Sequence, residues 1–307
     1  MPLHLRIKPH VLQMGWHRFL MIETGTPTEA RFLLTIIATQ LSQAQIENPR
    51  RDANLILQMA LQSDEPILMH HEITLDDAAH DRLNHLIEER KKGCPISRLR
   101  GSREFYSLNF ALNAATLDPR PDSETLVDVA IKACADRPWH MADFGTGSGC
   151  LLISVLKHCG NATGIGLDIA AEGIALAREN AKNNGVDDRA VFTVSDWDSA
   201  LGTETRFDMI LSNPPYIPLS DEASLSPEVR LYDPPTALYG GVSGLEAYER
   251  VMGLIAKRLV DKGIALIEIG QGQEDDVTKI GCDAGLRPDG HYADLAGIIR
   301  VLKFVKT

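Results

Sequence analysis

"HMADFGTGSGCLLISVLKH" (residues 140–158) places an apolar run before three glycines and a segment of helical period. The apolar run predicts a buried strand, and the glycines let the backbone turn tightly into the helix that follows. Strands that alternate with helices predict an α/β fold with a mostly parallel, doubly wound sheet. The same alternation continues downstream, with strands expected at residues 162–168, 190–196, 207–213, 263–270 and 297–305 and helices at residues 170–185 and 244–259.

Upstream of this pattern, residues 28–92 show helical periodicity in three segments. They predict a small helical domain at residues 26–98. The stretch "GSREFYSLNFALN" (residues 101–113) alternates apolar and polar positions, which predicts a β-hairpin linker within residues 99–115. The α/β domain then occupies residues 116–307.

The first 25 residues are interpreted as a leader that is either disordered or wrongly assigned to the chain. Arg6, Lys8 and Arg18 occur there without an acidic residue before Glu23, as in a transit peptide. The first 22 residues contain no serine, however, and two later methionines, Met14 and Met21, are alternative starts.

Composition describes an ordinary globular chain of 307 residues, 44% of them hydrophobic and 24% charged. A net charge of −11 argues against a partner held mainly through its phosphates, so no direct binding of nucleic acid is expected. The five cysteines are scattered and have no metal-ligand spacing, which predicts a reduced, cytoplasmic compartment and no metal site. No apolar run reaches the roughly 18 residues of a membrane span, so no membrane association is expected.

Polar residues end four of the predicted strands: Asp143, Asp168, Asp196 and Asn213. In a doubly wound sheet the carboxyl ends of the strands lie at one edge, and ligands bind there. These four side chains are therefore expected to belong to one site.

The glycine loop at the first of these strand ends is predicted to approach a cofactor closely. Its spacing is neither that of the dinucleotide motif nor that of a phosphate-binding loop, and a strand-to-helix turn that needs glycine for geometry alone is the alternative. Asp168 is predicted to accept both hydroxyls of a ribose, with a helix N-cap as its alternative role. The predicted cofactor contacts in this loop are Asp143, Gly145, Thr146, Gly147, Ser148 and Gly149.

An acid and an indole follow the third strand, and an amide, two prolines and a phenol follow the fourth. Asp196 and Trp197 suit the edge and the face of an adenine, although a buried structural tryptophan is the alternative. In "NPPY" (residues 213–216), the side-chain oxygen of Asn213 and the carbonyl of Pro214 can accept both hydrogens of a planar nitrogen. Pro214 and Pro215 fix these acceptors, and Tyr216 covers the flat group.

Two acceptors for one planar nitrogen favour the electronic state in which its lone pair can attack. The alternative, a Pro-rich turn that only caps a strand, leaves the other strand-end residues unexplained. Together these residues predict methyl transfer from S-adenosylmethionine to a planar nitrogen, with S-adenosylhomocysteine as the product and without a metal.

Six segments carry a resemblance to a known family: "DFGTGSG", "NPPYIP", "PISRLRGSREFYSLNF", "PRPDSE" (residues 119–124), "SPEVRLYDPPTALYGGVSGLEAYERV" and "EIGQGQ". In these segments the chain resembles the protein-(glutamine-N5) methyltransferases. These enzymes modify the Gly-Gly-Gln motif of class 1 peptide chain release factors. The resemblance implies a helical N-terminal domain that docks the substrate, a hairpin linker, and a seven-stranded methyltransferase domain whose last strand is antiparallel.

By position, the resemblance assigns residues 145–149, Asp168, Trp197 and Asn213 to the donor and residues 213–216 to the glutamine amide. Arg120 and Glu124 are implied near the pocket wall, with a salt-bridged surface pair as the alternative. Asp118 departs from the family, which commonly has an aliphatic residue before "PRP", and "EFYSL" replaces the more usual "EFWGL".

Three hypotheses follow. The first is a monomeric release factor glutamine methyltransferase. The second is an amino-methyltransferase acting on adenine in DNA or RNA, which poses the same geometric problem but fits the negative charge poorly. The third is a non-catalytic interaction module, against which all four strand-end polar residues are present.

Overall fold

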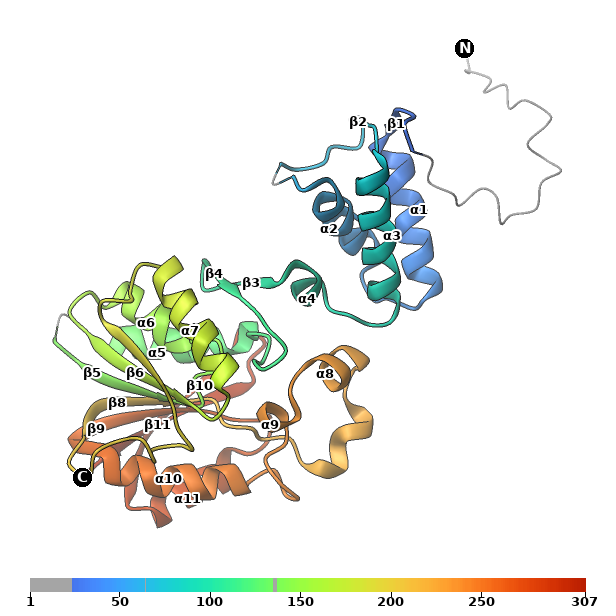
Figure 1. Cartoon of the computed structure of the whole chain (residues 1–307). Coiled ribbons are helices and arrows are strands. Elements are labelled where there is room, and N and C mark those ends of the chain that lie inside the picture. The colour runs from blue at the N-terminus through green and yellow to red at the C-terminus, as the bar shows by residue number, and fades with distance from the viewer. Residues whose placement is uncertain (1–23, 64, 135–136) are drawn as a thin grey trace. The chain divides into compact units, whose positions relative to one another are not determined.

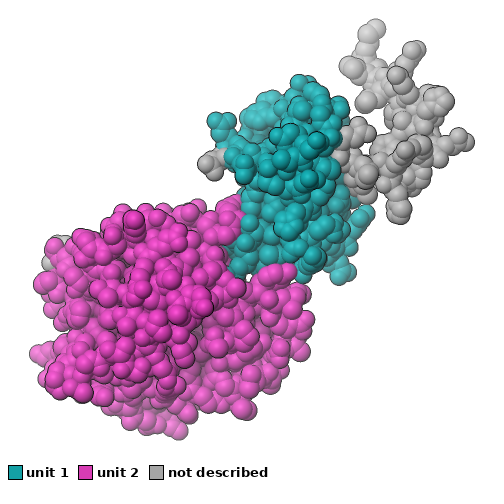
Figure 2. All heavy atoms as spheres, viewed as in Figure 1, with its two compact units in different colours: residues 1–99 teal, residues 100–307 magenta. Residues whose placement is uncertain are grey.

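The computed structural model describes residues 24–307, except residues 64 and 135–136. The expected leader therefore lies almost entirely outside the described residues. The chain separates into two compact units, residues 1–99 and residues 100–307, which Figure 2 colours differently.

The N-terminal unit is built from three helices, α1 (Ala30–Gln43), α2 (Pro49–Leu61) and α3 (Asp77–Lys91). Two-residue strands, β1 (Thr28–Glu29) and β2 (Glu72–Ile73), pair antiparallel beside them. The helices bury one apolar stripe each, including Leu33, Ile37, Leu41, Ile56, Leu57, Leu83 and Ile87.

A buried ion pair joins two of these helices. The Arg90 Nε lies 2.7 Å from the Asp52 Oδ2, and Arg90 also donates to the Cys94 carbonyl at 3.1 Å. Because both side chains are almost inaccessible to solvent, removal of either partner would leave a buried charge uncompensated.

A hairpin opens the second unit, directly after the short helix α4 (Ile96–Arg100). Strands β3 (Ser102–Phe105) and β4 (Leu108–Ala111) pair antiparallel around a two-residue turn. Asn180 fixes the hairpin to the rest of the unit, since its side chain accepts from the Ala111 amide at 2.8 Å and donates to the Ala111 carbonyl at 3.1 Å. The predicted hairpin is therefore present and anchored.

The second unit contains a seven-stranded sheet in the order β10-β11-β9-β8-β5-β6-β7. The five strands β9, β8, β5, β6 and β7 are parallel neighbours, and β11 is antiparallel to both β9 and β10. The expected doubly wound sheet with an antiparallel last strand is thus confirmed. The strands are β5 (His140–Phe144), β6 (Thr163–Asp168), β7 (Ala190–Val194), β8 (Phe207–Ser212), β9 (Leu259–Glu268), β10 (Leu286–Ala293) and β11 (Ile299–Lys306).

Helices cover both faces of this sheet (Figure 1). On one face, α5 (Glu124–Cys134), α6 (Cys150–His158) and α7 (Ala171–Asn183) pack on Met141, Met209 and Leu211. On the other, α10 (Glu246–Arg258) and α11 (Glu274–Asp283) pack on Ala142, Ile210 and Ile267. Successive strand residues enter opposite cores, as the twofold period of a strand requires.

Shorter elements lie between the main strands and helices along the chain. They are η3 (Pro121–Ser123) before α5, and η4 (Leu219–Ser224), α8 (Pro227–Tyr232) and α9 (Pro235–Leu238) between β8 and α10. Within the described part of the chain, no helix combines the length and the apolar character needed to span a bilayer.

Candidate functional site

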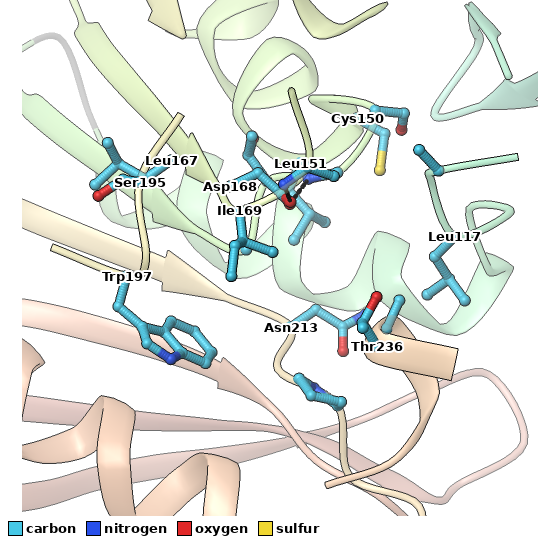
Figure 3. Close-up of a pocket in the computed structure, with 18 of the residues that line it drawn as sticks. Leu117, Cys150, Leu151, Leu167, Asp168, Ile169, Ser195, Trp197, Asn213 and Thr236 are labelled. Carbon is cyan, nitrogen blue, oxygen red and sulfur yellow. Dashed lines mark hydrogen bonds between the residues drawn. The ribbon is translucent and has the colours of Figure 1, made fainter. Parts of the chain in front are cut away.

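A cavity of about 280 Å³ lies at the carboxyl ends of β5, β6, β7 and β8 (Figure 3). The turns after these strands line it, together with parts of residues 115–123 and 236–237. Of the side chains and glycines predicted for the site, ten line the cavity: Arg120, Gly145, Thr146, Gly147, Ser148, Asp168, Asp196, Trp197, Asn213 and Pro215. Five lie outside its lining: Glu124, Asp143, Gly149, Pro214 and Tyr216.

The glycine loop turns between β5 and α6 with its first amides tied to the neighbouring strand. The amides of Gly145 and Thr146 both donate to the Leu167 carbonyl, at 2.9 and 3.0 Å. Gly149 has a φ of +81°, and a Cβ there would lie 2.8 Å from the Ile153 Cδ1. Helix packing therefore explains the glycine at 149, and the expected cofactor contact at that position is absent from the cavity lining.

Asp143 lies beneath the loop, fully buried. Its Oδ2 accepts from the Thr146 hydroxyl at 2.6 Å, while no described residue forms a hydrogen bond with its Oδ1 by the same geometric standard. Burial raises the pKa of Asp143 to about 7, and the hydrogen bond from Thr146 opposes that rise. Asp143 was predicted to contact the cofactor, but it does not line the cavity. It stabilises the glycine loop through its hydrogen bond with Thr146.

Asp168 ends β6 and faces the cavity. Its Oδ2 accepts from the Gly147 amide at 2.8 Å and its Oδ1 from the Ala170 amide at 2.9 Å. The N-cap of α7 is Ala170, so Asp168 does not have the alternative N-cap role. Because a carboxylate oxygen can accept more than one hydrogen bond, both oxygens retain capacity for a ligand hydroxyl.

Trp197 and Asp196 follow β7. The indole and the Ile169 side chain, which is 65% exposed, face the cavity and offer it apolar surface (Figure 3). Trp197 has a φ of +52°, a backbone conformation that costs a non-glycine residue roughly 1–2 kcal/mol and so marks a constrained position. Asp196 is paired with Arg250, with 2.5 Å between the Arg250 Nη2 and the Asp196 Oδ2.

Asn213 follows β8 directly, and its Nδ2 lies 3.4 Å from the Ser123 Oγ. The loop after it is hydrogen-bonded to residues 238–240. The Ile217 amide donates to the Leu238 carbonyl at 2.9 Å, and the Gly240 amide donates to the Ile217 carbonyl at 3.0 Å. The Gln273 side chain also donates to the Tyr216 carbonyl at 3.0 Å. The two prolines therefore belong to a loop that a second segment fixes.

Tyr216 is the aromatic residue of this loop. Burial raises its pKa to about 12, and the nearby charge of Glu268 adds to the rise. The phenol is therefore neutral at physiological pH. It packs beside the core beneath the loop and does not line the cavity.

Arg120 lines the cavity and forms an ion pair with Asp233. Glu124 lies outside the lining because its Oε1 accepts from the Tyr106 amide in the hairpin turn at 2.9 Å. The two are therefore not the salt-bridged pair considered as an alternative. The unusual Asp118 is buried, with its Oδ1 3.9 Å from the Arg103 Nε.

Sequence reasoning missed several residues of the site. Thr236, Ala237 and Arg250 line the cavity, and Ser123 contacts Asn213. Glu268, within the quoted "EIGQGQ", is buried beside Asn213. An acid near the end of the strand predicted at residues 263–270 was the available signal for Glu268. The others lie in segments quoted for the family resemblance, but their chemistry alone does not place them at the site.

Two family profiles match the chain. The "Methyltransferase small domain" matches residues 121–225, and the "PrmC N-terminal domain" matches residues 33–101. The first covers the glycine loop and the turn at Asn213, and the second covers the helical unit.

Curated relatives match most of the chain. A release factor glutamine methyltransferase of Rhodospirillum rubrum is 39% identical over 286 residues, which is 91% of this chain and 87% of the relative. Its namesake in Agrobacterium fabrum is 38% identical over 273 residues, 86% of this chain and 93% of the relative. A third, from Caulobacter vibrioides, is 36% identical over 279 residues, 89% of this chain and 94% of the relative. Identity of this extent over most of the chain means that the chain belongs to the release factor glutamine methyltransferase family.

Proposed function

We propose that this protein transfers the methyl group of S-adenosylmethionine to the side-chain amide nitrogen, N5, of the glutamine in the Gly-Gly-Gln motif of class 1 release factors. The single observation that carries the proposal is the placement of Asn213. It follows β8 at the cavity, and its amide nitrogen is engaged by Ser123. The side-chain oxygen is thereby left for a substrate N–H.

The residues at the strand ends fit the donor. The two oxygens of Asp168 match the two hydroxyls of a ribose, and Trp197 and Ile169 offer apolar surface to a purine. Gly145, Thr146, Gly147 and Ser148 bring backbone close to the ligand. When bound, S-adenosylmethionine supplies an electrophilic methyl group on a sulfonium and leaves as neutral S-adenosylhomocysteine.

The acceptor side needs no strong base. Asn213 Oδ1, in the cavity lining, and the carbonyl of the next residue, Pro214, just outside that lining, accept the two amide hydrogens. This directs the nitrogen lone pair towards the methyl carbon. A C–N bond forms as the C–S bond breaks, and the nitrogen then releases one proton to water. Because the loop is already fixed by its hydrogen bonds to residues 238–240, little reorganisation is needed at reaction.

The substrate is a protein, and the helical unit offers it a surface. Phe32, Leu68 and Met69 are about half exposed or more, and apolar side chains of this size commonly mark contact sites. We propose that residues 26–98 dock the release factor. We also propose that the protein works as a monomer in the cytoplasm. The five free cysteines fit a reducing compartment.

The test is donor-dependent methylation of a purified class 1 release factor, followed by tandem mass spectrometry of the Gly-Gly-Gln peptide. One added methyl on the glutamine side chain is expected, and none on a release factor with glutamate at that position. An adenine-containing oligonucleotide in parallel tests the other amino-acceptor class. Methylation of the oligonucleotide alone, with a steep dependence on salt, would contradict the proposal.

A further inference from the structure

Glu268, a buried acid to which the proposed mechanism gives no role, lies on the strand next to the one that Asn213 follows. Glu268 is the last residue of β9, which pairs in parallel with β8 so that Ser212 lies opposite Ile267. Glu268 is 2% exposed, and its Oε2 has no hydrogen-bond partner among the described residues. Asn213 and Glu268, the residues that follow this pair, are therefore neighbours across the two strands.

Among the residues that the structure describes, none forms a direct ion pair with Glu268. Arg300, whose charge acts on Glu268, is engaged with Asp294 at 2.9 Å and with Asp122 at 2.8 Å. Hydrogen-bonding contacts from the Ser123 hydroxyl and the Asn213 amide favour the charged form of Glu268, but they only partly offset its burial. A buried carboxylate held this way destabilises the fold, so a functional reason for it is expected.

The reason lies in the symmetry of an asparagine side chain. The two ends of its amide have nearly the same shape, so only hydrogen-bond partners decide which end faces the cavity. A carboxylate can only accept hydrogen bonds, and it therefore selects the NH2 end of Asn213. The Ser123 hydroxyl accepts from the Asn213 Nδ2 at 3.4 Å and can itself donate a hydrogen bond to the same carboxylate.

We propose that Glu268 is a positioning residue: directly and through Ser123, it holds the Asn213 amide nitrogen away from the substrate, so that the Asn213 oxygen faces the nitrogen to be methylated. The proposal rests on the acceptor role proposed above for Asn213. Without a buried acceptor, the reversed amide would present two donors to a substrate NH2 and would repel it.

Protonation of Glu268 should have the same effect as its removal, because a carboxylic acid can donate to the Asn213 oxygen and stabilise the reversed amide. Burial raises the pKa of Glu268 to about 7, so turnover should rise with pH through that value as the carboxylate ionises. The titratable or charged groups that act on or near this carboxylate are Asp122, Cys150, Tyr216, Tyr248 and Arg300. The tyrosines and the thiol stay neutral near pH 7, since burial raises the pKa of each.

The experiment compares the full-length protein with Glu268→Gln and Ser123→Ala, using a release factor as substrate. Glutamine keeps one acceptor oxygen but replaces the other with an NH2 group, which can donate to the Asn213 oxygen and stabilise the reversed amide. We expect Glu268→Gln to lower kcat by about tenfold or more, the usual effect of losing a hydrogen bond to a charged group. Donor affinity by calorimetry should remain near wild type, the melting temperature should not fall below that of wild type, and the rise of kcat near pH 7 should disappear.

Ser154→Ala is the matched control for Ser123→Ala. Both remove a buried serine hydroxyl from the same unit, but Ser154 lies on α6 and its hydroxyl has no hydrogen-bond partner. Ser123→Ala should lower kcat, whereas Ser154→Ala should not.

Wild-type kcat and an unchanged pH profile in Glu268→Gln would overturn the inference, and so would a loss of turnover that only follows a loss of donor binding. Asn213→Ala separates the two proposals. If that variant is inactive while Glu268→Gln is not, the positioning role fails and the acceptor role stands. If Asn213→Ala keeps its turnover, the acceptor role fails first.

Discussion

Gly240→Ala should slow methyl transfer without weakening the binding of S-adenosylmethionine, because Gly240 packs closely against the backbone of the loop that follows Asn213. A Cβ on Gly240 would lie 2.5 Å from the Pro215 carbonyl oxygen, 2.7 Å from the Gly244 carbonyl oxygen and 3.0 Å from the Tyr216 Cα. All three atoms belong to backbone and cannot rotate away. The loop itself must therefore move.

The size of this movement follows from the contact distances. Ordinary contact begins at 3.4 Å, so the Pro215 carbonyl must retreat from 2.5 to 3.4 Å, a shift of about 0.9 Å if Gly240 stays in place. Overpacking of this kind costs about 1–3 kcal/mol of stability. A displacement of about 1 Å in a reacting group can lower the rate about 10²-fold. We expect kcat to fall between tenfold and a hundredfold.

The assay is steady-state methylation of a release factor, with calorimetry of donor binding and thermal melting on the same preparations. Gly160→Ala is the matched control, because a Cβ at Gly160 meets nothing within 4 Å. The control should keep wild-type kcat. A folded Gly240→Ala variant with kcat within twofold of wild type would refute the reasoning, because the loop would then tolerate the shift.

Three further predictions concern binding and stability. In Asp168→Asn one acceptor oxygen is lost, so the side chain cannot accept equally well from the Gly147 and Ala170 amides and a ribose. The affinity for S-adenosylmethionine should therefore fall about tenfold or more by calorimetry, and an unchanged affinity would exclude the ribose role. Arg90→Leu leaves Asp52 buried without its partner and should cost about 3–5 kcal/mol in urea unfolding followed by circular dichroism, whereas a loss below 1 kcal/mol would contradict the pair's importance. In the unfolded chain Glu268 loses its proton near its ordinary pKa of 4.5, whereas in the folded state it keeps the proton up to its raised pKa of about 7. Wild type should therefore lose unfolding free energy relative to Glu268→Gln as pH rises from 5 to 8, by about 1.4 kcal/mol per unit of pKa shift, and a constant difference would argue against the raised pKa.

The parallel strands of the sheet were predictable because their apolar runs are continuous and end in glycine or polar residues. Strand β10 (Leu286–Ala293) was not predicted, because it is an edge strand with mostly exposed side chains and contains a proline and a glycine. Its pairing with β11 depends on backbone hydrogen bonds rather than on an apolar pattern. Edge strands of this kind leave little trace in sequence.

The site was predictable where one strand end supplies each residue, as for Asp168 and Asn213. It was not predictable where function depends on a neighbour from a distant segment. Glu268 meets Asn213 only because β9 lies beside β8, and Gly240 matters only because its segment packs behind the proline loop. Glu124 shows the reverse case, since an acid at a plausible position contacts the hairpin turn instead of the cavity.

The most direct measurement is the single-turnover rate of Asn213→Ala, with donor affinity determined on the same protein. If the Asn213 oxygen orients the substrate nitrogen, the rate should fall by about 10²–10³-fold, the usual effect of removing one preorganised hydrogen-bond partner from an active site. Donor binding should weaken but remain measurable, since Asp168 and the glycine loop are intact. A single-turnover rate equal to wild type at saturating donor and release factor would contradict the acceptor role of Asn213.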